Sequence, residues 1–185
     1  GLDFGYTNDP TALVAIYSLN GGYILDELLF QKGMLNSQIA GVIQALERNV
    51  VVVADSAEPK SIDELAQYGI AMIPATKGRD SVRVGIDVVQ DQRISVTRRS
   101  VNILNEYRNY LWSTDNDGKV LSVPEAGYDH TMDALRYAIT SLPRMIRPLT
   151  GEQRKSLVFM RAMERKHRLQ GAGTQGRGRK FISRV

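Results

Sequence analysis

The first 30 residues of the chain carry the pattern that most restricts its fold. Three apolar or alternating segments, "LDF", "TALVAIYSL" and "YILDELLF", are separated by the turn sequences "TNDP" and "NGG". Alternation and β-branched runs are typical of strands, and Asn-Gly is typical of hairpin turns. The sequence therefore predicts three consecutive antiparallel strands, of which the second is apolar enough to be buried on both faces.

Helix and strand patterns alternate after residue 34. Apolar residues recur at helical spacing over residues 35–48, with Asn36 or Ser37 as a candidate cap. The segment "SIDEL" starts a second helix, with Ser61 and Glu64 at capping-box spacing. The strand-like run "VVVVAD" lies between these helices, and the strand-like "IAMIPA" and "RISVT" follow with a helix between them. This order predicts an α/β fold, with three antiparallel strands followed by parallel strands in one mixed sheet flanked by helices.

Two further helices and a connector complete the predicted domain. "SVNILNEYRNYLW" has an amphipathic pattern, and the polar connector after it has a hairpin signal at "DNDGK". The final helix, "DHTMDALRYAITSL", starts at Asp129, which is a good N-cap residue. We expect this helix to stop before Pro143.

Charge divides the chain into two parts. Residues 1–142 hold 12 Lys and Arg against 18 Asp and Glu, a net charge of −6, whereas residues 143–185 hold 12 against 2, a net charge of +10. We predict an α/β domain over 1–142 and a basic extension over 143–185, with a basic helix at 151–169 and a flexible Gly-rich end. A basic tail suits nucleic acid or another acidic surface, and a solubilising terminus is the alternative.

Three aspartates occupy positions where α/β folds place functional groups. Asp3 lies in the first strand, Asp55 ends the "VVVVAD" strand, and Asp133 lies on the last helix, three residues after His130. Residues at that spacing share a helix face, and open α/β sheets form their sites at the carboxyl ends of strands. Converging carboxylates repel one another without a cation, and oxygen ligands favour Mg²⁺ or Mn²⁺. We expect the three aspartates to converge on two such ions, with His130 as a further ligand or as the group that orients the attacking water.

Each of these residues also has an ordinary structural interpretation. Asp3 could be a surface residue of an edge strand, Asp55 a turn residue, and His130 a residue of the first helical turn. Asp26 and Glu27 are expected at a solvated strand end. The residues by themselves leave these alternatives open.

Several chemistries lack their sequence signatures. The chain has no cysteine, which excludes disulfides, thiolate nucleophiles and cysteine zinc sites, and its two histidines exclude a multi-histidine zinc site. No G-x-x-x-x-G-K-[ST] P-loop and no G-x-S-x-G nucleophile elbow is present. The apolar runs are too short to cross a bilayer, so we expect no membrane association.

Three blocks of the sequence resemble one protein family. "GLDFGYTNDPTALVAIY", "VVVADSAEPKSIDEL" and "DHTMDALRYAI" resemble, in this order, the nuclease domain of the large terminase subunits of tailed bacteriophages. The resemblance covers about residues 1–142, and the third block is the most specific. It implies an RNase H-like fold of the retroviral integrase superfamily, in which helices flank a mixed sheet of five strands.

The resemblance also implies a function. It implies a two-metal endonuclease, dependent on Mg²⁺ or Mn²⁺, that cuts double-stranded concatemeric viral DNA when a capsid is filled. Matching the blocks assigns as catalytic metal ligands Asp3, Asp55, His130 and Asp133. Because such cleavage shows little sequence preference, phosphate contacts should dominate, and the candidates for them are Lys77, Arg79, Arg98 and Arg99.

The resemblance further implies partners and a location. The packaging ATPase that normally precedes this nuclease is not in the sequence, and the chain begins inside the first strand, so we expect a C-terminal part of a longer protein. The expected partners are that ATPase domain, the portal and the small terminase subunit. The expected location is the procapsid portal in the host cell cytoplasm, where the basic tail would bind DNA, the portal or the small subunit.

Two alternative functions stay open. The same fold could serve a junction resolvase or an RNA–DNA hybrid nuclease. A catalytically silent acidic cluster with a basic tail would instead make a DNA- or portal-binding module, which predicts salt-sensitive binding without metal-dependent cleavage.

Overall fold

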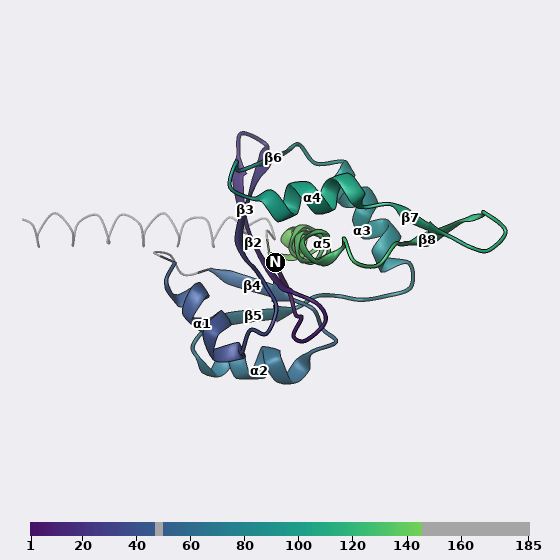
Figure 1. Ribbon diagram of the computed structural model, residues 1–185. Helices are drawn as coiled ribbons and strands as arrows, with labels where there is room; N and C mark the ends of the chain where they lie inside the picture. The colour runs from purple at the N-terminus through teal and green to yellow at the C-terminus, as the bar shows by residue number, and fades with distance from the viewer. Residues whose placement is uncertain (47–49, 146–185) are drawn as a thin grey trace, which may run out of the picture. The chain divides into compact units, whose positions relative to one another are not determined.

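The structure is a computed structural model that describes residues 1–46 and 50–145. Helices and strands alternate along most of this range (Figure 1). The elements are, in chain order, β1 (Leu2–Asp3), β2 (Thr11–Leu19), β3 (Gly22–Gln31), α1 (Asn36–Gln44), β4 (Val51–Ala54), α2 (Pro59–Gln67), β5 (Ala71–Pro74), α3 (Ser81–Gln90), β6 (Ile94–Val96), α4 (Val101–Asn109), β7 (Trp112–Thr114), β8 (Val120–Pro124) and α5 (His130–Met145).

The predicted mixed sheet is confirmed, including the last strand that the pattern of "RISVT" predicts. β1, β2 and β3 are antiparallel neighbours, and β4, β5 and β6 join parallel to their partners in the order β5-β4-β1-β2-β3-β6. The described sheet has six strands, whereas the resemblance implied five; the sixth, β6, pairs along the start of β3. The β2–β3 turn has positive φ at Asn20 and Gly21, which a tight hairpin requires. β7 and β8 form a separate hairpin around the predicted "DNDGK" turn.

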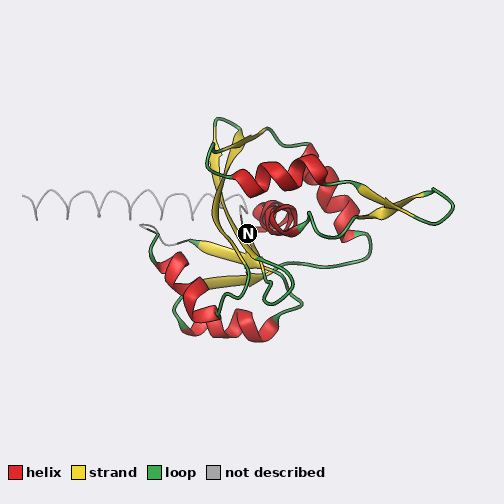
Figure 2. Ribbon diagram, in the orientation of Figure 1, coloured by secondary structure: helices red, strands yellow, loops and turns green. Residues whose placement is uncertain are grey.

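Helices cover both faces of this sheet (Figure 2). α1 and α2 lie on one face, where Ile39, Ile43 and Leu65 pack against Leu2 and Val52 of the central strands. Burying an apolar side chain of this size contributes about 1.5–3 kcal/mol. The apolar stripe of each helix therefore determines which side of the helix faces the sheet. The polar sides of both helices stay in solvent.

α5 lies against the other face, with α3 and α4 beside it (Figure 1). Ala134, Leu135 and Ile139 of α5 pack with Val14 of β2 and Leu25 of β3. Because α5 crosses β1, β2 and β4, its first turns reach the edge of the sheet at which β1 and β4 end.

Tertiary contacts shift the predicted helix starts. Neither Asn36 nor Ser37 caps α1; Leu35 precedes the first turn, and its N–H donates to Gln38 Oε1 at 2.9 Å. α2 starts earlier than expected, at Pro59, which suits the first helical position because that position needs no N–H partner. The predicted capping box of Ser61 and Glu64 is therefore wrong, since both residues lie inside the helix.

The predicted stop before Pro143 is also wrong. α5 continues to Met145 and includes Pro143. Proline removes one backbone hydrogen bond, and here that loss falls in the last described turn of α5.

The expectation that Asp26 and Glu27 are solvated does not hold. Asp26 is buried, and its Oδ1 accepts hydrogen bonds from Thr97 Oγ1 and Arg99 Nε, each at 2.7 Å. Glu27 Oε2 accepts two backbone N–H groups in the first turn of α4, at 2.9 and 3.1 Å. The segment from β6 to α4 folds over β3, and these two carboxylates hold it there.

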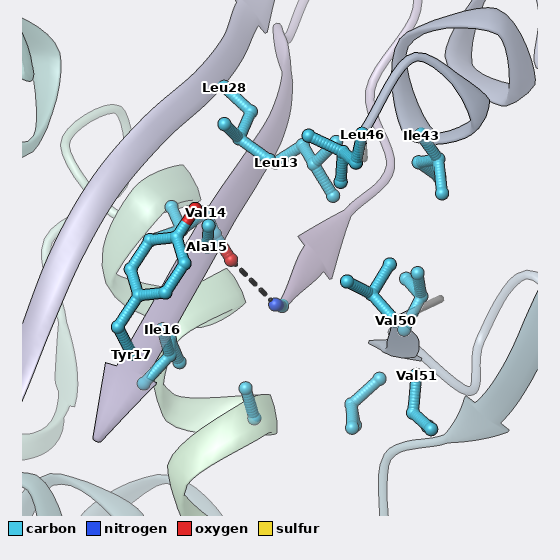
Figure 3. A pocket seen from close by; sticks show the side chains of 14 residues that line it. Leu13, Val14, Ala15, Ile16, Tyr17, Leu28, Ile43, Leu46, Val50 and Val51 are labelled. Carbon is cyan, nitrogen blue, oxygen red and sulfur yellow. Dashed lines mark hydrogen bonds between the residues drawn. The ribbon is translucent and has the colours of Figure 1, made fainter. Parts of the chain in front are cut away.

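A cavity of about 560 Å³ lies between β2 and β4, beside the short strand β1. Figure 3 shows its apolar lining, with Val14 and Tyr17 of β2 on one side and Val50 and Val51 on the other. The backbone nitrogen of Gly1 donates to the Val14 carbonyl at 2.8 Å. The lining contains none of the candidate site residues, so this cavity is separate from the candidate site.

Two predictions concern the ends of the described region. No helix in residues 1–46 and 50–145 is both long and apolar enough to cross a membrane. The basic extension, including the helix at 151–169 and the Gly-rich end, falls outside the described residues from 146 onward. Its organisation stays a prediction, as does the domain boundary at residue 142.

Candidate active site

Two of the predicted aspartates lie at adjacent strand ends. Asp3 is the last residue of β1, and Asp55 directly follows β4, which pairs in parallel with β1 through Leu2 and Ala54. The backbone N–H of Asp55 donates to the Leu2 carbonyl at 3.1 Å and extends this pairing by one residue. Parallel neighbours end at the same edge of a sheet, so the two carboxylates lie on that edge together.

The first turns of α5 bring His130 and Asp133 to the same edge. His130 Nδ1 lies 3.2 Å from Asp3 Oδ2, and the His130 ring packs edge-on against Phe30 with the ring centroids 6.4 Å apart. His130 Nε2 faces two further carboxylates, Asp9 at 3.7 Å and Asp129 at 3.9 Å. The structure therefore brings all four predicted site residues together, from β1, the end of β4 and α5.

The start of α5 is fixed by a buried carboxylate from α4. Glu106 Oε2 accepts the backbone N–H of Thr131 at 2.6 Å and also the Thr131 hydroxyl. Asp129 lies at the predicted N-cap position, and its carbonyl accepts the Asp133 N–H at 2.6 Å, but its side chain bonds the Gly127 N–H instead. Glu106 therefore supplies the side-chain acceptor for an N–H in the first turn of α5. A carboxylate is favourable at the N-terminus of a helix, where the helix dipole is positive.

The electrostatics of the edge show that the charges of Asp133 and Asp55 act on Asp3. Burial raises the pKa of Asp3 to about 6, the hydrogen bond with His130 opposes this rise, and the charges of Asp133 and Asp55 add to it. Burial also raises the pKa of Tyr137, and the charges of all three aspartates raise it further. One hydroxyl group therefore lies in the field of three carboxylates, an arrangement that a bound cation would stabilise.

Each of these carboxylates has a basic partner. The three pairs are His130 with Asp3, Lys77 with Asp55, and Arg136 with Asp133. The hydrogen bond with Asp3 raises the pKa of His130 above its ordinary value. The three aspartate side chains are 13, 18 and 25% exposed, so their charges are only partly screened by water.

Arg136 is held from two sides. Its guanidinium lies 4.8 Å from the centroid of the Tyr137 ring, and its Nη2 lies 2.6 Å from Asp133 Oδ2. The Tyr137 hydroxyl donates to the same oxygen at 3.2 Å. The stem of Arg136 packs against Gly85 of α3, where a Cβ would come within 2.7 Å of Arg136 Cδ. The small residue on α3 thus makes room for the arginine that orients Asp133.

The donor set of this edge fits a divalent cation. It consists of carboxylate oxygens and one imidazole nitrogen, which suit Mg²⁺ and Mn²⁺. Burial is the main cause of the raised pKa of Asp3, and the charges of Asp133 and Asp55 add a repulsion that such an ion would relieve. Within the described part of the chain, no three His, Asp or Glu side chains have an arrangement that could hold a metal ion. Each of the three aspartates contacts a basic side chain.

Comparison with known proteins identifies the family. A family model described as "Terminase RNAseH like domain" matches residues 3–141. The chain belongs to the terminase RNase H-like family.

Relatives of this terminase domain support the assignment. The large terminase subunit of Bacillus phage SPP1 is 38% identical over 146 residues, which cover 75% of this chain and 34% of the relative. The PBSX phage terminase large subunit of Bacillus subtilis strain 168 is 28% identical over 144 residues, which cover 75% of this chain and 33% of the relative. The chain therefore spans about a third of the length of these curated relatives.

A solved structure confirms the fold of the terminase domain. The crystal structure of the g2p (large terminase) nuclease domain from bacteriophage SPP1 with bound Mn matches with a TM-score of 0.67 and 32% identity. The match covers 76% of this chain and 83% of that chain. The RNase H-like α/β fold expected from the sequence is thereby confirmed.

The candidate DNA contacts of the terminase domain fall into two places. Lys77 and Arg79 lie on the loop between β5 and α3, where Lys77 already contacts Asp55 and Arg79 is exposed. Arg98 and Arg99 are exposed on the loop between β6 and α4, and Arg99 is bound to Asp26 in the middle of β3. Only the first loop reaches the aspartates, and the roles of all four in DNA binding stay predictions.

Sequence reasoning missed three side chains of this site. Glu106 lies within a helix pattern with nothing to mark it as a cap for another helix. Arg136 and Tyr137 lie in the "DHTMDALRYAI" block, one turn after Asp133, and that spacing could have indicated them as its neighbours. Their contacts with Gly85 and Lys77 depend on segments that are distant in the sequence.

Proposed function

We propose that this chain is a metal-dependent endonuclease that cuts double-stranded DNA by two-metal phosphodiester hydrolysis. The observation that carries this proposal is the convergence of Asp3, Asp55 and Asp133; burial is the main cause that raises the pKa of Asp3 to about 6, and the charges of Asp133 and Asp55 add to the rise. Like charges that gather at one partly buried site are destabilising unless cations offset them. The family and the nuclease domain of phage SPP1, described with bound Mn, support the same chemistry.

The residues of the site have distinct roles in this proposal. Asp3, Asp55 and Asp133 would hold two Mg²⁺ or Mn²⁺ ions, with His130 as an additional nitrogen ligand. When bound, such ions lower the pKa of water and stabilise the leaving oxygen of a phosphodiester. If His130 is not a ligand, its Nε2 is the atom placed to orient a water molecule, because its Nδ1 is occupied by Asp3. Arg136 and Tyr137 keep the Asp133 carboxylate in place through two contacts to one oxygen.

DNA would be bound mainly through its phosphates. Lys77 and Arg79 lie on the loop beside the aspartates, and Lys77 would reach a phosphate only after leaving Asp55. Arg98 and Arg99 lie on a second loop and would contact DNA further from the cut. Contacts of this kind carry little sequence information, which fits a nuclease with little sequence preference.

The biological setting is part of the proposal. The matched relatives are large terminase subunits that are about three times as long as the matched region. We infer that the domain cuts concatemeric viral DNA during genome packaging, beside a packaging ATPase domain and together with the portal and the small terminase subunit. The site of action would be the procapsid portal in the host cell cytoplasm.

The test is cleavage of supercoiled plasmid with no metal, Mg²⁺, Mn²⁺ or Ca²⁺. The wild-type chain should nick and linearise the plasmid with Mg²⁺ or Mn²⁺, and Asp55→Asn should abolish cutting while the protein stays folded. Asp63→Asn is the matched control, because Asp63 is an exposed carboxylate on α2, which lies on the opposite face of the sheet from α5. Cutting by a clean Asp55→Asn protein would contradict the assignment.

Substrate comparison separates the proposal from its alternatives. Linear duplex should be cut at least as well as a four-way junction or an RNA–DNA hybrid. A strong preference for the junction or the hybrid would contradict the assignment to viral duplex DNA. Salt-sensitive DNA binding without any metal-dependent cleavage would support a binding module instead.

A further inference from the structure

The ion pair between Lys77 and Asp55 differs from the other two pairs at the site. His130 and Arg136 belong to α5, and their side chains are only 14 and 7% exposed. Lys77 comes from the loop between β5 and α3, and its side chain is 43% exposed. A lysine carries its charge on a flexible stem, so Lys77 can leave its carboxylate without disturbing the core.

Backbone pairing places Lys77 beside Asp55. The N–H of Ala75 donates to the Ala54 carbonyl at 2.7 Å, which continues the pairing of β5 with β4 to the last residue before Asp55. Ala75 is buried, so the start of the loop is fixed. Lys77 follows two residues later, within reach of the carboxylate that ends β4.

The ammonium group lies among the groups that would surround a metal ion. It contacts Asp55 Oδ1, an oxygen that also accepts the Ala57 N–H at 2.9 Å. It lies 5.6 Å from the centroid of the Tyr137 ring, and the Tyr137 hydroxyl donates to Asp133. Lys77 therefore places a positive charge between the Asp55 carboxylate at the end of β4 and the ring of Tyr137. The hydroxyl of Tyr137 is hydrogen-bonded to Asp133 on α5.

We propose that Lys77 is a placeholder cation, which neutralises Asp55 until a divalent ion displaces it. An ammonium and a divalent ion at contact distance from one carboxylate oxygen repel each other strongly, so the presence of one disfavours binding of the other. Loading of the site therefore favours the release of Lys77, and the lysine charge raises the metal concentration at which loading occurs. This inference rests on the metal site of the proposed function.

The test measures metal affinity and not cleavage. Mn²⁺ is titrated calorimetrically into the wild-type chain, Lys77→Met and Lys77→Arg, with Asp55→Asn as the variant that should bind poorly. Lys77→Met keeps the stem and removes the charge, so its Kd for Mn²⁺ should fall by about 1.5- to fivefold, the effect of removing one partly exposed charge pair. Lys77→Arg keeps the charge and should show no such gain. Lys119→Met, in the β7–β8 turn, should bind as the wild type does.

A second measurement uses the wild-type chain. The Lys77 amine is labelled by reductive methylation at increasing Mn²⁺ concentrations, and its modification is compared with that of Lys119 by mass spectrometry. Labelling of Lys77 should increase as Mn²⁺ binds, whereas labelling of Lys119 should stay constant. This readout does not depend on the folding of any variant.

The outcomes separate this inference from the proposed function. If the wild-type chain binds Mn²⁺ through Asp55 while Lys77→Met shows the same or a higher Kd, the placeholder role is wrong and the metal site stands. Constant labelling of Lys77 across the Mn²⁺ titration would overturn it in the same way. If neither the wild type nor Lys77→Met binds Mn²⁺, the metal site of the proposed function fails, and the placeholder role fails with it.

Discussion

Gly85 on α3 leaves the space into which the side chain of Arg136 on α5 packs. A Cβ at position 85 would lie 2.7 Å from Arg136 Cδ and 2.8 Å from its Cγ. Arg136 in turn holds the carboxylate of Asp133. A helix interior normally favours alanine over glycine. The glycine at position 85 is therefore explained by the space that Arg136 needs and not by the helix propensity of α3.

Gly85→Ala should destabilise the protein by about 1–3 kcal/mol, because the added methyl group overpacks a filled site. The gain in helix propensity, up to about 1 kcal/mol, offsets only part of this. Urea unfolding followed by circular dichroism measures the change. The variant should also bind Mn²⁺ less tightly, because displacing Arg136 disturbs Asp133.

The matched control is Gly41→Ala on α1, where a Cβ would meet no atom within 4 Å. Alanine at this exposed position should stabilise the protein by about 0.5–1 kcal/mol. Equal effects at positions 41 and 85 would show that packing against Arg136 does not matter.

Glu106 is the buried acceptor that holds the start of α5, and burial raises its pKa. Glu106→Ala should lower the free energy of unfolding by about 1–3 kcal/mol, because the N–H and hydroxyl of Thr131 lose their partner. Glu106→Gln keeps one acceptor oxygen and should lose less. Thermal and urea unfolding of both variants measure this order.

The same pair of variants tests whether Glu106 positions the site. Glu106→Ala should weaken Mn²⁺ binding more than Glu106→Gln, because His130 and Asp133 lie in the turn that Glu106 holds. Equal stability and equal metal affinity in the two variants would contradict the capping role.

Local sequence pattern was enough to place the four predicted site residues. Asp3 and Asp55 follow apolar strand patterns, so their positions at strand ends depend only on nearby residues. His130 and Asp133 are set by the spacing of one helix. Their convergence followed from a single topological condition, that β1 and β4 be neighbours, which the sheet order satisfies.

The features that sequence reasoning missed depend on contacts between distant segments. A charge pattern shows that Arg99 is basic but not that it is bound to Asp26, which is 73 residues away. In the same way, Lys77 is one basic loop residue until β5 places it beside Asp55. The capping box at Ser61 failed because α2 starts two residues earlier, at Pro59.

Asp3→Asn should make the metal-free protein more stable. Asp3 is buried beside Asp55 and Asp133, and replacing its charge by a neutral amide removes both the desolvation and the repulsion. We expect an increase of about 1 kcal/mol in the free energy of unfolding in EDTA. An excess of Mn²⁺ should stabilise the wild type by about 2.7 kcal/mol at 100 times its Kd, and should stabilise Asp3→Asn much less.

Asp63→Asn on α2 serves as the control for removing a carboxylate outside the site. Its free energy of unfolding in EDTA, and the increase in that free energy with excess Mn²⁺, should both stay close to the wild-type values. An Asp3→Asn protein that is less stable than the wild type in EDTA would show that the bond with His130 outweighs the repulsion.

Asp26 should make stability depend on pH in the acid range. The hydrogen bond from Arg99 lowers the pKa of Asp26 in the folded state, with a smaller contribution from Thr97. The folded state therefore binds this proton less readily than the unfolded state does. The stabilisation is fully present above the unfolded pKa, about 3.9, and is lost as pH falls through the folded pKa. Asp26→Asn should remove this contribution.

Urea unfolding of the wild type and Asp26→Asn between pH 2.5 and 7 measures the effect. The difference in free energy should be largest near neutral pH and should shrink steadily below about pH 4. In the wild-type background, Arg99→Gln should lower the free energy of unfolding with the same pH dependence. In Asp26→Asn it should lower the free energy of unfolding little further, because the two residues form one interaction. A difference that stays constant down to pH 2.5 would mean that the Asp26 charge does not hold the β6–α4 segment on β3.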